Sequence, residues 1–299
     1  MSRILITGAS GFIGSHLLQH LCAQGHDVTA VSRNVIDSPS TARWVQADLG
    51  DAAAVDRLFT QQAPDVVYHL ASYVTGRRDI GEVLPMLEAN LNAAVRVLAA
   101  ATQTGCTRVV LAGSMEEPDP ASAEPPGSPY AAAKAAQTLY ARFFHALYGT
   151  PAVVARIFMV YGPGQRDLQK VIPYAVLRGL DGAPAELRSA ARPVDWIYVD
   201  DVVRGLASMG TANGIDGLSI ELGSGTAVTV GDMVRCVADQ IGSPIPLLGG
   251  GPPRELETAR CADVARTFSL LGFRAEIDIE TGLHRTIDWY RAERAAARL

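Results

Sequence analysis

The chain has 299 residues, 48% of them hydrophobic and 19% charged, a balance that is typical of a folded globular protein and excludes a disordered one. Its formal net charge is -5 without a basic cluster, so we expect neither a nucleic acid nor an anionic membrane as a partner. The four cysteines lie far apart, without a Cys-x-x-Cys pair or the Cys/His spacing of a zinc site. We therefore expect reduced, mostly buried thiols and no bound metal.

The first segment, MSRILITGAS, lacks the long apolar stretch of a secretion signal. No segment reaches the roughly 18 apolar residues that cross a membrane. From both observations we expect a cytoplasmic protein.

Short apolar strands alternate with amphipathic helices through the first half of the chain. In chain order, the predicted strands cover 3–7, 27–33, 43–48, 65–72, 108–113 and 152–162. The predicted helices between them cover 12–25, 51–62, 82–105 and 129–149. Near-continuous apolar strands separated by helices indicate a parallel sheet covered on both faces, which is an α/β doubly wound Rossmann domain.

The alternation becomes irregular after Pro163. We expect one helix within 162–184, a strand and a helix within 194–209, a short strand and a glycine loop at 218–225, and helices near 229–241 and 280–292. We expect a dinucleotide-binding domain of residues 1–165, to which the chain returns at about 190–228. Residues 166–189 and 229–299 are expected to form a smaller C-terminal substrate lobe.

Gly8, Gly11 and Gly14 lie between the first strand and the first helix, in ITGASGFIGSHL. Glycine permits a tight turn, close approach of the backbone to a pyrophosphate, and close packing of helix on strand. The amides at the start of the helix then favour the phosphates. In this strand–loop–helix context the triplet predicts dinucleotide binding rather than an ordinary glycine turn.

The Thr-Gly-x-x-Gly-x-x-Gly spacing resembles the extended short-chain dehydrogenase/reductase family, which includes nucleotide-sugar epimerases, dehydratases and reductases. The resemblance covers nearly the whole chain, because ARIFMVYGPGQ and RPVDWIYVDDVVRGL match later segments of the family. It implies that further residues line the cofactor besides the three glycines. These are Ser10, Phe12, Ile13, Asp48, Leu49, Leu70, Ala71 and Ser72, with Tyr130 and Lys134 further along the chain.

The second strand ends in AVSRN, without the acidic residue that binds the ribose hydroxyls of NAD. Ser32 and Arg33 stand there instead, and a guanidinium suits the 2′-phosphate of NADP. We therefore expect NADP as the cofactor. NAD is the alternative if Arg33 stacks on the adenine or faces solvent.

Tyr130 and Lys134 lie one helical turn apart at the start of a helix, in SPYAAAKAA. A phenol with an ordinary pKa of about 10 is a poor base at neutral pH, and an adjacent ammonium lowers that pKa. Lys134 can also hold the nicotinamide ribose. Together with the glycine loop, the pair indicates a proton-transfer site rather than two surface residues.

The strand 108–113 leads into LAGSMEEPDP, where a hydroxyl and two carboxylates follow an apolar run. Ligands bind beyond the carboxyl ends of parallel strands, so Ser114 should lie near the nicotinamide. The resemblance implies that Ser114 hydrogen-bonds the reacting sugar oxygen and completes a Ser/Tyr/Lys triad. Glu116 resembles a glutamate of the 4,6-dehydratases, although Met115 replaces their aspartate. The alternative is that Glu116 and Glu117 form a solvated loop pair.

Arg192 and Arg254 are the candidate ligands of a substrate diphosphate, because a guanidinium fork suits phosphate oxygens. Met159 stands where the family's asparagine contacts substrate, which leaves that contact to another group. Asp200 and Asp201 match the family's segment but are more typical of helix caps than of catalysts.

Arg33 and the resemblance together favour an NADPH-dependent reduction of a 4-keto(-6-deoxy) sugar nucleotide, with Tyr130 as proton donor. The alternative is a nucleotide-sugar epimerase or 4,6-dehydratase that holds NAD tightly, and the third hypothesis is a non-catalytic dinucleotide sensor. Helices 82–105 and 129–149 carry broad apolar faces. In the family such a pair forms an intersubunit four-helix bundle, so the resemblance implies a homodimer.

Overall fold

A seven-stranded sheet organises the first of two compact units in this computed structural model, which describes residues 2–36, 42–119, 123–249 and 260–299. The predicted α/β class is confirmed. Unit 1 comprises Met1–Ile157, Val203–Glu221 and Ala265–Phe273. Unit 2 comprises Phe158–Val202, Leu222–Val264 and Arg274–Leu299.

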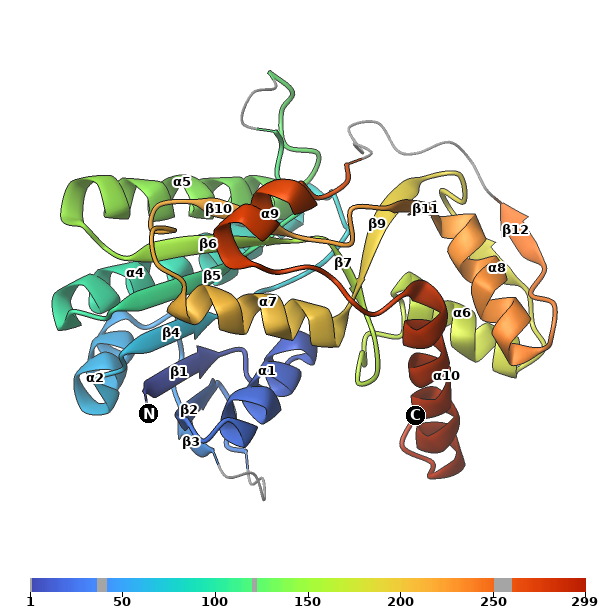
Figure 1. Cartoon of the computed structure of the whole chain (residues 1–299), viewed down its shortest axis with the longest axis horizontal. Coiled ribbons are helices and arrows are strands. Elements are labelled where there is room, and N and C mark those ends of the chain that lie inside the picture. Colours follow the sequence, from blue (N-terminus) through green and yellow to red (C-terminus); the bar gives the residue numbers. More distant parts are fainter. Residues whose placement is uncertain (1, 37–41, 120–122, 250–259) are drawn as a thin grey trace. The chain divides into compact units, whose positions relative to one another are not determined.

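The strand order of the large sheet is β10-β6-β5-β4-β1-β2-β3 (Figure 1). Neighbouring strands from β3 to β6 pair in parallel, which the near-continuous apolar sequence of each strand predicts. The chain reverses direction of winding after β3, so that β4 returns to the other side of β1. The strands are β1 (Arg3–Thr7), β2 (Asp27–Ser32), β3 (Arg43–Gln46), β4 (Val66–His69), β5 (Arg108–Ser114), β6 (Ala152–Ile157) and β10 (Ser219–Leu222).

Helices cover both faces of this sheet (Figure 1). On one face, α2 (Ala52–Gln62), α4 (Ala93–Thr104) and α5 (Pro129–Tyr148) bury side chains in a common core with the strands. That core includes Phe59 of α2 and Val97 of α4. The other face carries α1 (Phe12–Ala23), the end of α7 (Val199–Thr211), and α9 (Val264–Leu271).

The run predicted as one helix over 82–105 is interrupted. It consists of a 3-10 turn at Ile80–Glu82, α3 (Val83–Met86), a π-helical segment η2 (Leu87–Asn92), and α4. By length and composition alone, Ile80–Thr104 is apolar enough to cross a membrane. A core helix passes the same test, and α4 buries Ala94, Val97 and Leu98 against the sheet.

α9 is an element that the apolar pattern did not predict. It brings Ala265–Phe273 into unit 1, outside the ranges expected for the dinucleotide-binding domain. The Thr267 hydroxyl donates to the Glu221 carbonyl oxygen at 2.7 Å, and the Arg266 guanidinium donates to the Ser219 carbonyl oxygen at 3.1 Å. These polar contacts hold α9 against β10. The helix has only eight residues, which is too short for its apolar residues to show a clear helical period in the sequence.

Unit 2 contains two small sheets and three helices among its described residues. The predicted strand 152–162 divides at Phe158, so that its last part pairs in unit 2 with a strand near 195. One sheet has the order β11 (Ala227–Thr229), β9 (Pro193–Tyr198), β7 (Met159–Tyr161), and the other pairs β12 (Leu247–Gly249) with β8 (Ala185–Leu187). The helices are α6 (Val171–Leu180), α8 (Val230–Ile241) and α10 (Ile279–Ala295).

All four cysteines are free thiols, but the expectation that most are buried is wrong. Cys106 is buried, Cys22 and Cys236 are half-buried, and Cys261 is exposed. Each exposed or half-buried cysteine lies on a helix or a connection at the surface, where the sequence alone does not distinguish it from a core position.

Candidate active site

The glycine loop connects β1 to α1 in a tight turn. Gly8 has a φ of +71°, and a Cβ on it would lie 2.6 Å from the Ala71 amide nitrogen, so the backbones of the β1 and β4 loops touch there. The Gly11 amide donates to the Gly8 carbonyl oxygen at 3.0 Å. A Cβ on Gly14 would overlap the Gly8 carbonyl oxygen. Because glycine has no Cβ, α1 can start this close to β1.

This loop fits a dinucleotide. The exposed Ser10 and Gly11 lie at the N-terminus of α1, where backbone amides and the helix dipole favour phosphate oxygens. Thr7 holds the loop that follows β4. Its hydroxyl accepts the Ala71 amide at 3.3 Å and lies 2.8 Å from His69 Nδ1. Burial, and then the Lys134 charge, lower the pKa of His69 to about 3, so this imidazole is neutral.

The residues predicted to contact the adenine side also reach the edge of the sheet. Ser32 ends β2 and its hydroxyl accepts the Asn34 amide at 3.2 Å, while Arg33 is exposed. Asp48 is exposed just beyond β3, where its carboxylate accepts the Gly50 amide at 2.9 Å, and Leu49 is buried. None of these contacts distinguishes NAD from NADP.

Tyr130 lies in the first turn of α5 because Ser128 starts that helix. The Ser128 hydroxyl accepts the Ala131 amide at 3.1 Å, and Pro129 supplies the first helical residue, which needs no amide. The Tyr130 hydroxyl hydrogen-bonds the side chains of Ser114 and Ser72. The structure therefore brings together a residue from the end of β5, one following β4, and one from α5.

Lys134 follows one turn later and is 1% exposed. Its ammonium donates to the Ala112 carbonyl oxygen at 2.8 Å and to the Gln137 side-chain oxygen at 3.2 Å, and it lies 5.9 Å from the centre of the Tyr130 ring. Burial lowers the pKa of Lys134 to about 8, and the Glu117 carboxylate opposes that effect.

Tyr130 itself is a protonated phenol in this structure. Burial raises its pKa most, the Glu116 carboxylate raises it further, and the hydrogen bond with Ser114 lowers it. Glu116 is exposed, and its amide donates to the Ser114 hydroxyl oxygen at 3.1 Å. The two adjacent glutamates are thus unlike each other, because Glu117 is buried.

Asn90 is a site residue that the sequence reasoning missed. It is fully buried in the π-helical segment, a kind of distortion that often occurs at functional sites. Its side-chain oxygen accepts the Ser72 hydroxyl at 3.0 Å and the Tyr73 amide at 2.7 Å, while its amide group donates to the Tyr73 carbonyl oxygen at 2.9 Å. Glu88 and Asn92 beside it are polar as well, so no pattern in the sequence marks Asn90 as the buried one.

Of the predicted substrate residues, Ser114 lies in unit 1, whereas the two arginines lie in unit 2 or outside the described residues. Arg192 is half-buried just before β9, and its role toward a diphosphate stays a prediction. Arg254 falls outside the described residues. Asp201 is buried, and its carboxylate accepts the amides of Glu276 and Ile277 at 3.1 and 3.0 Å, which is a structural role within unit 2.

Comparison with known proteins identifies the family of this chain. Residues 4–223 match the NAD dependent epimerase/dehydratase family. The chain belongs to this family. The family's glycine loop, Ser114, Tyr130 and Lys134 positions all fall within the matched residues.

Three similar proteins illustrate the activities found in the epimerase/dehydratase family. A dTDP-glucose 4,6-dehydratase of an Actinoplanes species is 30% identical, over 98% of this chain and 99% of its own. A UDP-glucose 4-epimerase of Mycolicibacterium smegmatis is 28% identical, over 97% and 98%. The structure of MoeE5 in complex with UDP-glucuronic acid and NAD is 32% identical, with a TM-score of 0.85 over 97% of this chain and 99% of that one.

These comparisons support an NAD-dependent enzyme that acts on nucleotide sugars. They do not support the expected preference for NADP, since the cofactor named in the family and in the related structure is NAD. An exposed arginine at the end of β2 is compatible with either cofactor, so the preference for NADP expected from Arg33 stays a prediction.

The glycine loop yields the first testable prediction. Substituting Gly14→Ala forces a methyl group into the Gly8 carbonyl, so the loop must open and its phosphate site is lost. We expect the affinity for NAD, measured by titration calorimetry, to fall at least about tenfold. Gly81→Ala is the control, because a Cβ there meets nothing within 4 Å, and it should leave NAD affinity unchanged.

The Glu116 carboxylate yields a second prediction. Replacing it in Glu116→Gln removes a negative charge that raises the pKa of Tyr130, so the phenolate forms at lower pH. The acidic limb of the pH–kcat/KM profile should therefore move to lower pH. An unmoved or upward-shifted limb in an active variant would contradict the placement of Glu116 beside the tyrosine.

Proposed function

We propose that this protein is a nucleotide-sugar 4-epimerase that uses NAD, with a pyrimidine-nucleotide diphosphate hexose as substrate. The observation that carries the proposal is the cluster of Ser114, Tyr130 and Lys134 at the ends of β5 and α5, in the same unit as the glycine loop. UDP- and dTDP-sugars are the substrates named for the similar proteins, which supports the pyrimidine nucleotide.

The chemistry assigned to the side chains is a reversible proton transfer. The glycine loop would hold NAD, which would supply a reversible hydride acceptor for the sugar carbon. Tyr130 Oη, in its phenolate form, would take the proton of the sugar 4-hydroxyl as that carbon is oxidised, become the phenol, and give the proton back on reduction. The Ser114 hydroxyl holds the same oxygen, and the Lys134 ammonium offsets the charge of the phenolate. Return of the hydride to the opposite face of the sugar gives the epimer.

Dehydration is the second candidate function. Loss of water between C5 and C6 requires one group to remove the C5 proton and another to protonate the departing hydroxyl, in addition to Tyr130. The segment after β5 offers the Glu116 carboxylate beside Tyr130, and a similar protein is a 4,6-dehydratase. However, Met115 is a buried thioether with no proton to give, which favours epimerisation.

The relatives favour the epimerase and dehydratase hypotheses over the NADPH-dependent reductase expected from Arg33. Epimerisation and dehydration both return the cofactor to its starting state in every cycle, whereas a reductase consumes one reduced cofactor per product. We further propose that Arg192 and Arg254 bind the substrate diphosphate, because a guanidinium matches phosphate oxygens.

The proposed reaction is tested by supplying UDP-hexoses and dTDP-hexoses to the purified protein and identifying products by NMR. The 4-epimer should appear without net consumption of NADH or NADPH. A 4-keto-6-deoxy product would establish the second candidate, and stoichiometric NADPH consumption would establish the reductase instead.

The role of Tyr130 is tested by Tyr130→Phe. Loss of the proton-transferring hydroxyl should lower kcat by about 10²- to 10⁴-fold and leave NAD affinity nearly unchanged. Tyr140→Phe on the same helix is the control, because Tyr140 is 40% exposed and has no part in the cluster. Wild-type kcat in Tyr130→Phe would remove the basis of the mechanism.

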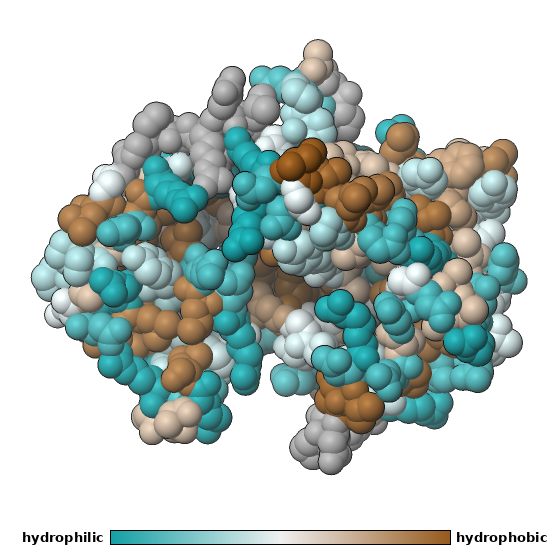
Figure 2. Space-filling view, turned by 180° about the vertical axis from the view of Figure 1, so that it is seen from behind, coloured by the Kyte–Doolittle hydropathy of each residue, from teal (hydrophilic) through white to brown (hydrophobic). Residues whose placement is uncertain are grey.

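We also propose that two copies associate through Ile80–Thr104 and α5. Several apolar side chains on these helices are exposed, and Figure 2 shows hydrophobic side chains in the upper right region, where α5 lies after the half turn from Figure 1. Exposed apolar clusters of this kind are typical of protein interfaces. The exposed residues are Leu84, Leu87, Leu139, Phe143, Leu147 and Tyr148.

Leu139→Glu combined with Leu147→Glu tests this association. Each leucine is more than 60% exposed, at 63% and 62%, so a glutamate costs little in the monomer but is strongly unfavourable in an apolar interface. Light scattering should report a dimer for wild type and a monomer for the double variant. Leu248→Glu, at another exposed leucine in β12, should remain dimeric.

A further inference from the structure

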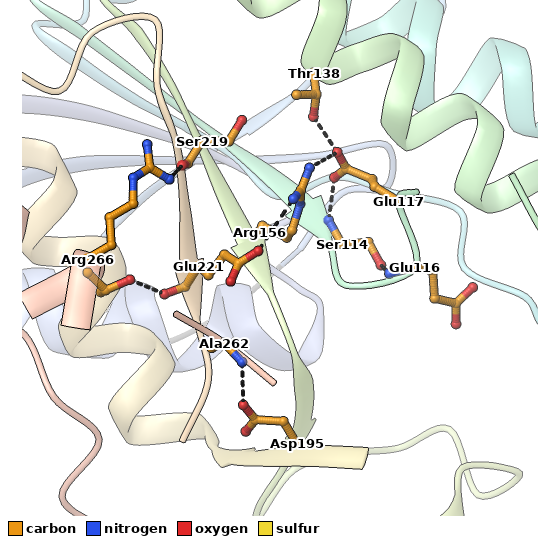
Figure 3. A network of polar contacts seen from close by, with 11 residues as sticks. Ser114, Glu116, Glu117, Thr138, Arg156, Asp195, Ser219, Glu221, Ala262 and Arg266 are labelled. Carbon is orange, nitrogen blue, oxygen red and sulfur yellow. Dashed lines mark hydrogen bonds and ion pairs between the residues drawn. The ribbon is translucent and has the colours of Figure 1, made fainter. Parts of the chain in front are cut away.

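Glu117 is a buried carboxylate directly behind the catalytic cluster. Its side chain is 1% exposed, although it follows the exposed Glu116 in the chain and was considered with it as a solvated pair. Figure 3 shows the two side chains pointing in different directions, with Glu117 directed toward Thr138 and Arg156. A buried carboxylate costs several kcal/mol unless its oxygens are satisfied, so its contacts indicate its role.

Three contacts of the Glu117 carboxylate anchor it next to Ser114. One carboxylate oxygen accepts the Ser114 backbone amide at 2.7 Å. The other accepts the Thr138 hydroxyl at 2.7 Å and lies 3.3 Å from the Arg156 guanidinium. Gly113 makes room for this arrangement, because a Cβ there would lie 2.7 Å from the first oxygen. A helix, a strand and the loop after β5 therefore meet at one carboxylate.

The Ser114 amide needs such an acceptor because β5 is longer than its neighbour. β4 pairs with β5 only as far as His69 and Leu111. On the opposite side, β6 continues alongside, and Ile157 lies beside Ser114. The Ser114 amide lies beyond the last β4–β5 pair, and the Glu117 carboxylate accepts it in place of a strand.

The buried charges around Glu117 balance. Arg156 lies between two carboxylates, with Glu117 at 3.3 Å and Glu221 at 3.4 Å. The negative charge of Glu117 also favours the ammonium form of Lys134 against the effect of burial. Two cations and two anions thus share this part of unit 1, so Glu117 lies among partners of opposite charge.

We propose that Glu117 is a positioning residue: anchored by Thr138 and Arg156, it fixes the backbone of Ser114 and thereby sets the Ser114 hydroxyl toward the substrate oxygen. The inference rests on the proposed function for the part played by Ser114. Glu117 itself contacts neither substrate nor cofactor in this assignment. A 1 Å displacement of an orienting group can cost about 10²-fold in rate, so the anchor affects catalysis rather than binding.

Thr138 offers the sharpest test, because it anchors Glu117 without carrying a charge. Thr138→Val keeps the shape but removes the hydroxyl, whereas Thr138→Ser keeps the hydroxyl and leaves a small cavity. We expect kcat to fall about tenfold in Thr138→Val and to stay within about twofold of wild type in Thr138→Ser. KM for the sugar and the affinity for NAD should change less than about threefold in both.

A packing role predicts a different order. If Thr138 only filled space, Thr138→Ser would lose more activity than Thr138→Val. Neither substitution would then lower kcat while leaving KM unchanged. Wild-type kcat in Thr138→Val, or a larger loss in Thr138→Ser, would overturn the proposal. Glu117→Gln, which weakens the bond to Ser114, should lose more than Thr138→Val, about 10²-fold in kcat.

A second readout does not depend on the substrate. Hydrogen–deuterium exchange of the peptide that covers the end of β5 should be faster in Glu117→Gln and Thr138→Val than in wild type, and unchanged in Thr138→Ser. If wild type turns over no nucleotide sugar, the proposed function fails and this exchange pattern alone decides the positioning role. Unchanged exchange in both Glu117→Gln and Thr138→Val would overturn it.

Discussion

The parallel pairing of the strands is the constraint on which the candidate site depends. Because the strands from β3 to β6 run in the same direction, their carboxyl ends meet at one edge, and the loops that follow them are neighbours. The glycine loop after β1, Ser72 after β4 and Ser114 at the end of β5 all lie at this edge. Tyr130 reaches it because Ser128 starts α5 at that point.

The different lengths of β4 and β5 determine which groups hold the candidate site. β5 runs past β4, so its last amide requires a partner that is not a strand, and Glu117 supplies one. Asn90 has a comparable role beside β4, where it holds both Ser72 and the backbone of Tyr73. Two buried polar side chains from outside the triad therefore hold the groups that contact the Tyr130 hydroxyl. Such fixed neighbours keep the site in one geometry before substrate arrives.

The sequence predicted much of this arrangement, because apolar strands and helical periods of ordinary length determine the sheet. The glycine loop and the Tyr130–Lys134 pair were likewise recognisable from spacing. Three features were not. α9 is short and held by polar contacts, the π-helical segment gives no periodic signal, and nothing in the sequence distinguishes the buried Glu117 from the exposed Glu116. The choice between NAD and NADP also does not follow from Arg33, because an exposed side chain at a strand end does not fix the ligand.

The most direct test is a crystal structure with NAD and a UDP-hexose bound. Tyr130 Oη and Ser114 Oγ should both lie within about 2.6–3.2 Å of the same sugar hydroxyl oxygen. The Glu117 carboxylate should keep its bond to the Ser114 amide and touch no atom of the sugar. A sugar that contacts neither Tyr130 nor Ser114, in a crystal whose protein is active, would contradict the account.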